Sequence, residues 1–418
     1  MTDLAVRDRV VTANGRTYRW PRRPTVVVCI DGSEPGYIEA AIEAGLAPHF
    51  ARLMRDGASL TALSAMPSFT NPNNISIITG CPPAVHGIAG NFFFDPETGE
   101  EVMMNDAKFM RTGTIMAAFH DAGAQVAVVT AKDKLRTLLA KGLDVSTGRA
   151  VAFSAEKADQ ATIEENGIGD LLETLGRPLP EVYSAELSGF VMAAGVHLLK
   201  FWRPDLMYLS TTDYIQHKAA PGTPVANAFY AMLDRHVGAL DELGCTLVLT
   251  ADHGMNDKHT PDGSPDVIYL QALLDDWLGK DQARVILPIT DPYVAHHGAL
   301  GSFATAYLPE SADLSAIKER LAALDGIDVV LTRQEASARF ELPPDRIGDL
   351  VVTSTIHKVI GTRAELHDLS GLDEPLRSHG GLTEQRVPLL ANRKVVLPAG
   401  RTLRNFDVFD VALNLVEG

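Results

Sequence analysis

The stretch PTVVVCIDG, residues 24–32, places five consecutive apolar residues directly before an aspartate and a glycine. A strand that is apolar along its whole length is typical of a parallel sheet covered by helices on both faces. The same pattern predicts three further strands, in AQVAVVTAK (124–132), DLMYLSTTD (205–213) and CTLVLTADHG (245–254).

Longer segments with helical periodicity separate these strands along the chain. They cover residues 47–57, 111–123, 184–202 and 225–244. Alternation of buried strands with helices predicts an α/β fold, with a doubly wound, mainly parallel sheet and helices on both of its faces.

The pattern loosens between residues 260 and 370, where short apolar runs such as SFATAYL and IDVVLT alternate with polar stretches. We expect a smaller α+β cap insertion there. The α/β core would then comprise residues 1–259 and 371–418, because VPLLANRKVV again reads as a core segment.

Composition excludes several classes of function. The chain has 418 residues, 46% of them hydrophobic, and a formal net charge of −16. Such a charge without basic clusters speaks against nucleic-acid binding, and no apolar stretch approaches the roughly 20 residues of a membrane span. Three cysteines without C-x-x-C spacing, and an N-terminal segment with interspersed charges, predict a soluble cytoplasmic protein.

Three of the four predicted strands end in a carboxylate, namely Asp31, Asp213 and Asp252. Ligands of open α/β sheets bind at the carboxyl ends of the strands. A single aspartate at a strand end usually forms a turn or caps a helix, but three in one sheet indicate a site.

Histidines accompany these carboxylates. Asp213 and His217 form a D-x-x-x-H pair on one helix face, His253 follows Asp252, and His379 lies in the glycine-rich turn RSHGG. Mixed aspartate and histidine ligands suit zinc. Six of them are too many for one tetrahedral ion and about right for two, with a hydroxyl completing the second.

That hydroxyl has two candidates in SAMPSFTNPNNISIITGCPPAVHGIAGN (64–91), namely Ser68 and Thr70. The polar turn before ISIIT could simply be a capped helix start. The alternative is a nucleophile at a helix N-terminus, where backbone N–H groups and the helix dipole favour a phosphoryl group.

The order of these motifs, from Asp31 through PSFTNPNNISIITG, HGIAGN, D-x-x-x-H, ADHG and SHGG, resembles the alkaline phosphatase superfamily and its nucleotide pyrophosphatase/phosphodiesterase branch. The resemblance implies Thr70 as the nucleophile in preference to Ser68, and Asn91 as an amide donor to a phosphoryl oxygen. It also implies two zinc sites, one formed by Asp31, Thr70, Asp252 and His253, the other by Asp213, His217 and His379.

Within the superfamily, IDGSEPGYIEAA and VVTAKDKLR make the chain most similar to hydrolases that split the carbon–phosphorus bond of phosphonoacetate. This resemblance implies a small anionic phosphonate substrate, a phosphothreonine intermediate, and acetate and phosphate as products. It also implies that Lys132 and Lys134 hold the substrate carboxylate. Two lysines at this spacing on extended backbone share a face; alternatively they are solvated lysines at a helix start.

Two other readings remain. A di-zinc phosphodiesterase or phosphomonoesterase would need a base-stacking or lipid-facing surface, which the sequence does not reveal. A non-catalytic binding module is disfavoured because clustered carboxylates repel one another without metals. The sequence leaves open the metal found in the cell, the oligomeric state, with a homodimer among the alternatives, and whether His296 and His297 reach the site.

Overall fold

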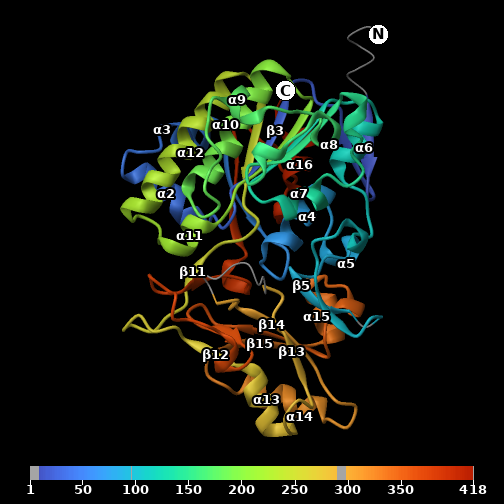
Figure 1. Ribbon diagram of the computed structural model, residues 1–418, viewed down its shortest axis with the longest axis vertical. Helices are drawn as coiled ribbons and strands as arrows, with labels where there is room; N and C mark the ends of the chain where they lie inside the picture. The colour runs from blue at the N-terminus through green and yellow to red at the C-terminus, as the bar shows by residue number, and fades with distance from the viewer. Residues whose placement is uncertain (1–8, 96, 290–297, 418) are drawn as a thin grey trace.

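The structure is a computed structural model that describes residues 9–95, 97–289 and 298–417. In this part of the chain the main sheet has seven strands in the order β4-β19-β10-β3-β9-β7-β8 (Figure 1). Their bounds are β3 (Thr25–Cys29), β4 (Ala58–Leu63), β7 (Val126–Thr130), β8 (Ala150–Ser154), β9 (Leu206–Ser210), β10 (Thr246–Thr250) and β19 (Arg386–Ala391).

The sheet is mainly parallel, as the sequence predicts. The five strands β10, β3, β9, β7 and β8 run parallel to one another. Strand β19 is antiparallel to both β10 and β4. The four strands predicted from apolar runs lie side by side in the middle of the sheet. Sequence reasoning did not identify β4 or β8.

Helices cover both faces of the main sheet. Side chains alternate along β3, so Val26 and Val28 pack in one apolar cluster while Val27 and Cys29 pack in another. The first cluster includes residues of α2 (Pro35–Glu43), α3 (Pro48–Asp56), α10 (Ala185–Phe201) and α12 (Pro224–Glu242). The second includes residues of α4 (Thr70–Thr79), α6 (Ile115–Asp121), α7 (Asp133–Leu139) and α16 (Val408–Asp410).

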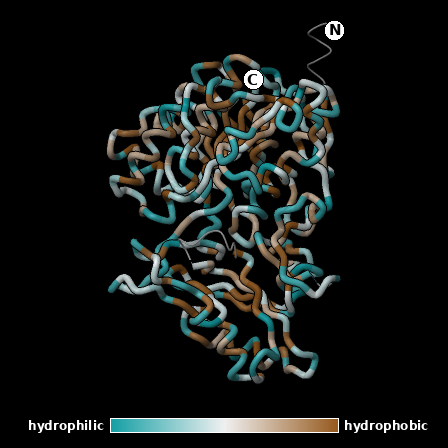
Figure 2. The backbone as a smooth tube through the Cα atoms, in the orientation of Figure 1, coloured by the Kyte–Doolittle hydropathy of each residue, from teal (hydrophilic) through white to brown (hydrophobic). Residues whose placement is uncertain are grey.

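A second, smaller sheet lies below the main sheet in Figure 1. It is antiparallel, in the order β13-β14-β16-β15, with bounds β13 (Arg284–Ile286), β14 (Phe303–Tyr307), β15 (Ile327–Thr332) and β16 (Leu350–Ser354). Its helices are α13 (Leu270–Leu278), α14 (Leu314–Ala322) and α15 (Arg333–Phe340). Figure 2 shows apolar backbone segments gathered inside both parts. The predicted α+β insertion is therefore present, while its limits at 260 and 370 stay a prediction.

Short two-stranded pairings complete the arrangement: β1 (Val10–Ala13) with β2 (Arg16–Arg19), β5 (Phe92–Asp95) with β6 (Glu100–Met103), β11 (Asn256–Asp257) with β18 (Arg377–Ser378), and β12 (Val267–Tyr269) with β17 (Val359–Gly361). The remaining α-helices are α5 (Pro83–His86), α8 (Ile163–Asn166), α9 (Leu171–Leu175) and α11 (Tyr214–Lys218). None of the helices in the described ranges combines the length and apolarity that a membrane span needs.

Candidate metal centre

The three strand-end carboxylates meet at one edge of the main sheet. Asp31, Asp213 and Asp252 follow β3, β9 and β10, which are adjacent in the sheet. Asp213 is the residue before α11, so His217 comes back over it one helical turn later, with Nε2 at 3.0 Å from Oδ2 of Asp213. The three carboxylates selected from the strand pattern thus lie at one edge of the sheet.

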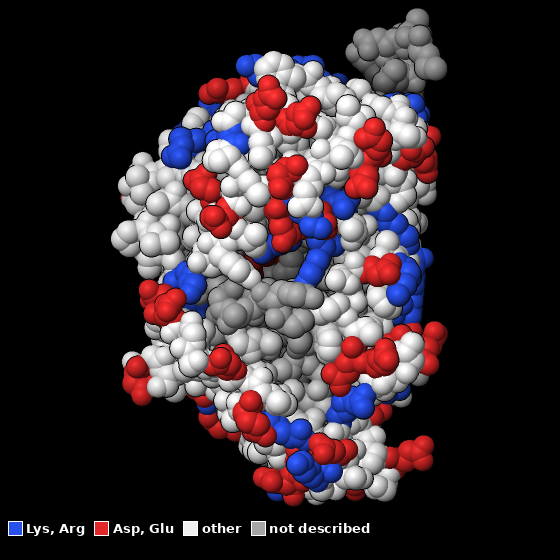
Figure 3. Space-filling view, in the orientation of Figure 1, with Lys and Arg blue, Asp and Glu red and all other residues white. Residues whose placement is uncertain are grey.

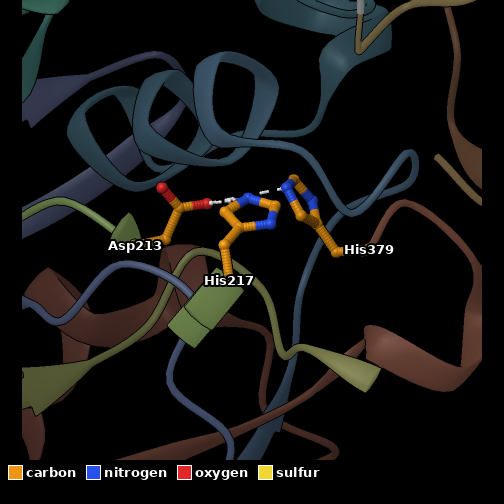
Figure 4. A group of neighbouring side chains, drawn as sticks. All are labelled: Asp213, His217 and His379. Atoms are coloured by element: carbon orange, nitrogen blue, oxygen red, sulfur yellow. Dashed lines mark ion pairs between the residues drawn. The ribbon is translucent and has the colours of Figure 1, made fainter. Parts of the chain in front are cut away.

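His379 reaches the same point from a distant part of the chain. The β11–β18 pairing brings residues 377–378 beside residues 256–257, and His379 follows directly with Nε2 at 3.6 Å from Oδ2 of Asp213. Figure 4 shows Asp213, His217 and His379 pointing toward one another.

Backbone carbonyls fix the orientation of these imidazoles. Nδ1 of His217 donates to the carbonyl oxygen of Arg377, and Nδ1 of His379 donates to that of Ser68, each at 2.8 Å. In a neutral ring the other nitrogen, Nε2, then carries the lone pair. On both rings the nitrogen that could bind a metal ion therefore lies on the side of Asp213. Histidines that bind metals commonly donate their other ring N–H to a carbonyl oxygen in this way.

His253 is oriented in the same way. Its Nδ1 donates to the carbonyl oxygen of Gly254 at 2.9 Å, which turns Nε2 toward Oδ1 of Asp31 at 3.4 Å. Its ring stacks on that of His379, with centroids 3.6 Å apart and planes 7° from parallel. All three histidines are buried.

Among the described residues, two groups of ligand atoms are close enough to hold metal ions, each with its atoms within 4.8 Å of one another. One comprises Asp213, His217 and His379; the other comprises Asp31, Asp213 and His253. Asp213 belongs to both, so ions in the two groups would be neighbours. The resemblance had placed Asp252 in the second group. In the structure Oδ1 of Asp252 accepts hydrogen bonds from the N–H groups of Gly32 and His253, and Oδ2 accepts one from Asn74.

The electrostatics of the cluster fit divalent cations. Burial, followed by the charges of Asp252 and Asp213, raises the pKa of Asp31 well above its usual range, and among the described residues its buried Oδ1 has no hydrogen-bond partner. Burial also opposes ionisation of Asp213, yet His217 and His379 hold its pKa well below the ordinary value. Burial, then His253 and His217, lowers the pKa of His379. Bound cations would compensate this buried negative charge.

Thr70 lies at the start of α4, where its hydroxyl oxygen faces the cluster. Phe69 is the residue before the helix and has extended backbone, and Thr70 Oγ1 lies 3.4 Å from Nε2 of His253. The helix is anchored by Asn74, whose Oδ1 accepts from the hydroxyls of Tyr208 (2.7 Å) and Ser210 (2.9 Å) on β9. In the first turn of α4, Asn71 donates its N–H to Oδ1 of Asn91, and Asn73 donates to the carbonyl oxygen of Phe69. Residue 72 is a proline without an N–H group, so the N–H of Thr70 is the donor of this turn left for an anion among the described residues.

Ser68 occupies a different environment. Its side chain is fully buried, and its hydroxyl donates to the carbonyl oxygen of Gly381 at 2.9 Å. It therefore ties the turn before α4 to the turn after His379. Phe69 is also fully buried and packs edge-on against Phe303 and His379, so it belongs to the core.

A buried ion pair holds the turn that carries His379. Glu384 accepts the N–H of Gly381 at 2.9 Å through Oε2 and the Nζ of Lys258 at 2.9 Å through Oε1. Lys258 also donates to the carbonyl oxygen of Ile356, just beyond β16 of the smaller sheet. The turn that carries His379 is thereby fastened to both parts of the molecule.

The cluster opens into a cavity of about 330 Å³. Basic and acidic side chains both border the hollow in the middle of the face drawn in Figure 3. Every predicted site residue except Asp252 and His253, which are fully buried, lies in its wall: Asp31, Thr70, Asn91, Lys132, Lys134, Asp213, His217 and His379. The residues selected from sequence thus come together around one cavity.

Two details of the wall differ from what the spacing suggested. Lys132 precedes α7 with extended backbone, but Lys134 lies in the first turn of that helix, so both reach the cavity from a helix start. Oδ1 of Asn91 accepts the N–H of Asn71 at 3.1 Å, and no described residue accepts from its Nδ2, which leaves that amide for a ligand.

Among the wall residues that sequence reasoning did not single out are Glu156, Tyr183 and Tyr214. The ring centroid of Tyr183 lies 4.9 Å from Nζ of Lys132, and Oε2 of Glu156 accepts the N–H of Asp133 at the start of α7, at 2.7 Å. Tyr214 adjoins Asp213 and could have been found from that position, whereas Glu156 and Tyr183 carry no local signal. His296 and His297 lie outside the described residues.

Comparison with known proteins places this centre in a family. Residues 25–382 match the model of the type I phosphodiesterase / nucleotide pyrophosphatase family, which spans most of the chain. The chain belongs to this family, and the resemblance drawn from its motifs is confirmed.

Among solved structures, the chain is similar to phosphonoacetate hydrolase from Sinorhizobium meliloti 1021, crystallised with phosphonoacetate and with phosphonoformate. The two share 64% identity, with a TM-score of 0.95 over 97% of this chain and 98% of that one. The fold also resembles murine ectonucleotide pyrophosphatase/phosphodiesterase 5, at 19% identity and a TM-score of 0.62 over 94% of this chain and 96% of that one.

A curated relative is ectonucleotide pyrophosphatase/phosphodiesterase 1 of Saccharomyces cerevisiae, 25% identical over 328 residues, which are 71% of this chain and 41% of the yeast protein. The chain matches between 41% and 56% of the length of its curated relatives.

Proposed function

We propose that this protein is a di-zinc hydrolase that cleaves the carbon–phosphorus bond of phosphonoacetate. The observation that carries the proposal is the position of Lys132 and Lys134 in the wall of the same cavity as Thr70 and the carboxylate–imidazole cluster. Phosphonoacetate carries a phosphonate group at one end and a carboxylate at the other. The phosphonate group has to be placed for attack, and the carboxylate has to be bound by positive charge. The likeness to the Sinorhizobium meliloti hydrolase supports this substrate.

Zinc suits the ligands present, because it accepts both imidazole nitrogen and carboxylate oxygen. We assign Asp213, His217 and His379 to one ion, and Asp31, Asp252, His253 and the Thr70 hydroxyl to the other. When bound, the two ions supply Lewis-acid stabilisation of phosphoryl charge and lower the pKa of a neighbouring hydroxyl.

Thr70 then acts as the nucleophile. The Thr70 hydroxyl gives its proton to water, and its oxygen forms a bond to phosphorus while the carbon–phosphorus bond breaks, with the bonding electron pair staying on the carbon. That carbon takes a proton from water to give acetate, and the phosphoryl group remains on Thr70 as phosphothreonine. A water molecule next attacks the phosphorus, which releases inorganic phosphate and restores the Thr70 hydroxyl.

The remaining wall residues bind and orient the substrate. Nδ2 of Asn91 donates to a phosphoryl oxygen, and the N–H of Thr70 at the start of α4 donates to the same group. Lys132 and Lys134 bind the carboxylate, which takes up negative charge as the carbon–phosphorus bond breaks. Their attraction therefore strengthens in the transition state, which is the condition for raising kcat.

The second candidate is a di-zinc phosphodiesterase or phosphomonoesterase of the nucleotide pyrophosphatase type, because the family match covers residues 25–382.

We place either reaction in the cytoplasm, since Cys29, Cys81 and Cys245 are all free thiols.

Product and metal analysis test the proposal together. We expect the purified protein to contain about two zinc ions per chain and to convert phosphonoacetate into acetate and phosphate in equal amounts. A nucleotide diester serves as the comparison substrate. Hydrolysis of the diester with no release of acetate from phosphonoacetate would assign the chain to the second candidate.

A further inference from the structure

A second basic hollow lies at the end of the main sheet opposite the metal centre. It includes Thr25 and Thr246, which begin β3 and β10 and are register partners, whereas Asp31 and Asp252 follow the other ends of these strands. From Thr25 to Asp31 the chain runs roughly 20 Å, at ~3.3 Å per residue. The hollow and the metal centre share no lining residue.

The charge of this hollow is unusual for so acidic a protein. Its wall contains one carboxylate, Glu417, and four arginines, which are Arg19, Arg22, Arg23 and Arg393. Within the described ranges no ion pair joins any of these four arginines to a carboxylate, although the chain carries a net charge of −16. The wall of the hollow thus carries more positive than negative charge, in a chain that is otherwise rich in carboxylates.

The guanidinium of Arg393 has a donor atom that is left without an acceptor. Its Nε atom is buried and has no hydrogen-bond partner among the described residues. Burial, and then the nearby charge of Arg23, lowers the pKa of the guanidinium, although the charge of Asp241 acts in the opposite direction. A buried donor without a partner costs free energy that a bound acceptor would recover.

We propose that this hollow binds a small tetrahedral oxyanion of the phosphate type. The guanidinium fork donates two parallel hydrogen bonds to phosphate-like oxygens, and several arginines together match the charge of a dianion. The volume is about 120 Å³, several times the roughly 30 Å³ that one water molecule takes up in the liquid. This inference is independent of the function proposed for the metal centre.

Trp20 makes the hollow measurable apart from the metal centre, because it lies in the hollow's wall, with the Arg9 guanidinium 3.7 Å from its ring centroid. The chain has three tryptophans, so the variant Trp202→Phe/Trp277→Phe leaves Trp20 as the one remaining reporter. We titrate this variant with inorganic phosphate and with sulfate, against sodium chloride at the same ionic strength.

We expect a saturable change in Trp20 fluorescence with phosphate and sulfate but not with chloride. Adding Arg23→Gln or Arg393→Gln to this variant should lower its affinity for phosphate at least about tenfold, because each substitution removes a charge-assisted hydrogen bond. The control Arg55→Gln, an exposed arginine paired with Asp56, removes the same charge and should leave binding unchanged.

Each hollow variant is first checked for a cooperative unfolding transition like that of the parent variant, which reports on the fold whatever reaction the metal centre performs. A response that does not saturate, that chloride reproduces, or that survives both arginine substitutions would overturn the proposal. Two independent substitutions keep the test decisive if one of them prevents folding.

Discussion

The hydroxyl oxygen of Thr70 lies 3.4 Å from Nε2 of His253, although 183 residues separate them in sequence. The relationship brings the first residue of α4 against the end of β10. It also defines where an attacking oxygen would sit relative to the buried carboxylates, and it separates Thr70 from Ser68, whose hydroxyl points to Gly381.

Replacing Thr70 should abolish turnover without disturbing the fold. Thr70→Ala removes the attacking oxygen, so we expect phosphonoacetate hydrolysis to fall by several orders of magnitude while zinc content is largely retained. Thr70→Ser should keep part of the activity. The matched control is Ser68→Ala, which should lower the free energy of unfolding by about 1–2 kcal/mol and retain turnover. Loss of turnover in the Ser68 variant alone would make Ser68 the nucleophile.

Replacing His379 should remove one metal ion. His379→Ala deletes the ligand that the β11–β18 pairing delivers, so bound zinc should drop from about two per chain toward one, with loss of activity. Elemental analysis of dialysed protein measures this. His357→Ala, which removes an exposed imidazole, is the control. Unchanged zinc and activity in the His379 variant would exclude His379 from the centre.

Replacing Lys132 or Lys134 should distinguish substrates. Either alanine variant should lower kcat and raise KM for phosphonoacetate, because the carboxylate gains charge in the transition state. Hydrolysis of an aryl phosphate ester, which has no carboxylate, should scarcely change. Steady-state kinetics on both substrates provide the comparison. Equal losses on the two would mean that the lysines serve the phosphoryl group or the fold.

His86 should make stability depend on pH. Burial, aided by the charge of Arg346, lowers its pKa to about 3, and its ring bonds Ser76 at 2.8 Å and the N–H of Ile88 at 3.1 Å. Below its unfolded pKa of ~6.5, the unfolded chain binds a proton that the folded chain refuses. This contribution to stability is therefore full above pH 6.5 and is lost progressively as pH falls toward 3.

Urea unfolding at pH 7.0 and 5.5 measures this effect. Wild-type protein should lose more free energy of unfolding over this interval than His86→Gln, by up to roughly 1.4 kcal/mol per pH unit. The comparison uses the change with pH within each protein, so a lower overall stability of the variant does not affect it. Identical pH dependences in the two proteins would contradict the assignment.

The central strands and most of the site could be predicted from sequence because their signals are local. The run VVVCI, followed directly by Asp31, predicts both a buried strand and a candidate ligand at the end of that strand. The D-x-x-x-H spacing predicts that Asp213 and His217 lie on one face of a helix. Strand β8 was missed, although AVAFS is as apolar as its neighbours and fully buried. Strand β4 shows half-exposed alternation, typical of a sheet edge, and gives a weaker signal.

The parts that could not be predicted depend on long-range contacts. Tyr183 and Glu156 enter the cavity wall from segments whose own residues carry no chemical pattern. The ion pair between Lys258 and Glu384 joins residues 126 positions apart, and only the folded chain shows that both are buried. The arginines of the second hollow are likewise split between the two ends of the sequence.

The strand order has a consequence for synthesis on the ribosome. Strand β4 is made early, yet its partner β19 (Arg386–Ala391) is translated about 320 residues later, which takes tens of seconds at roughly 5–20 residues per second. Through that interval β4 has no β19 to pair with, and neither has the edge of β10 once β10 has been made. Such unpaired strand edges are the exposure that chaperones shield. His379 is translated just ahead of β19, so the nascent chain completes its set of candidate metal ligands and its main sheet at nearly the same moment.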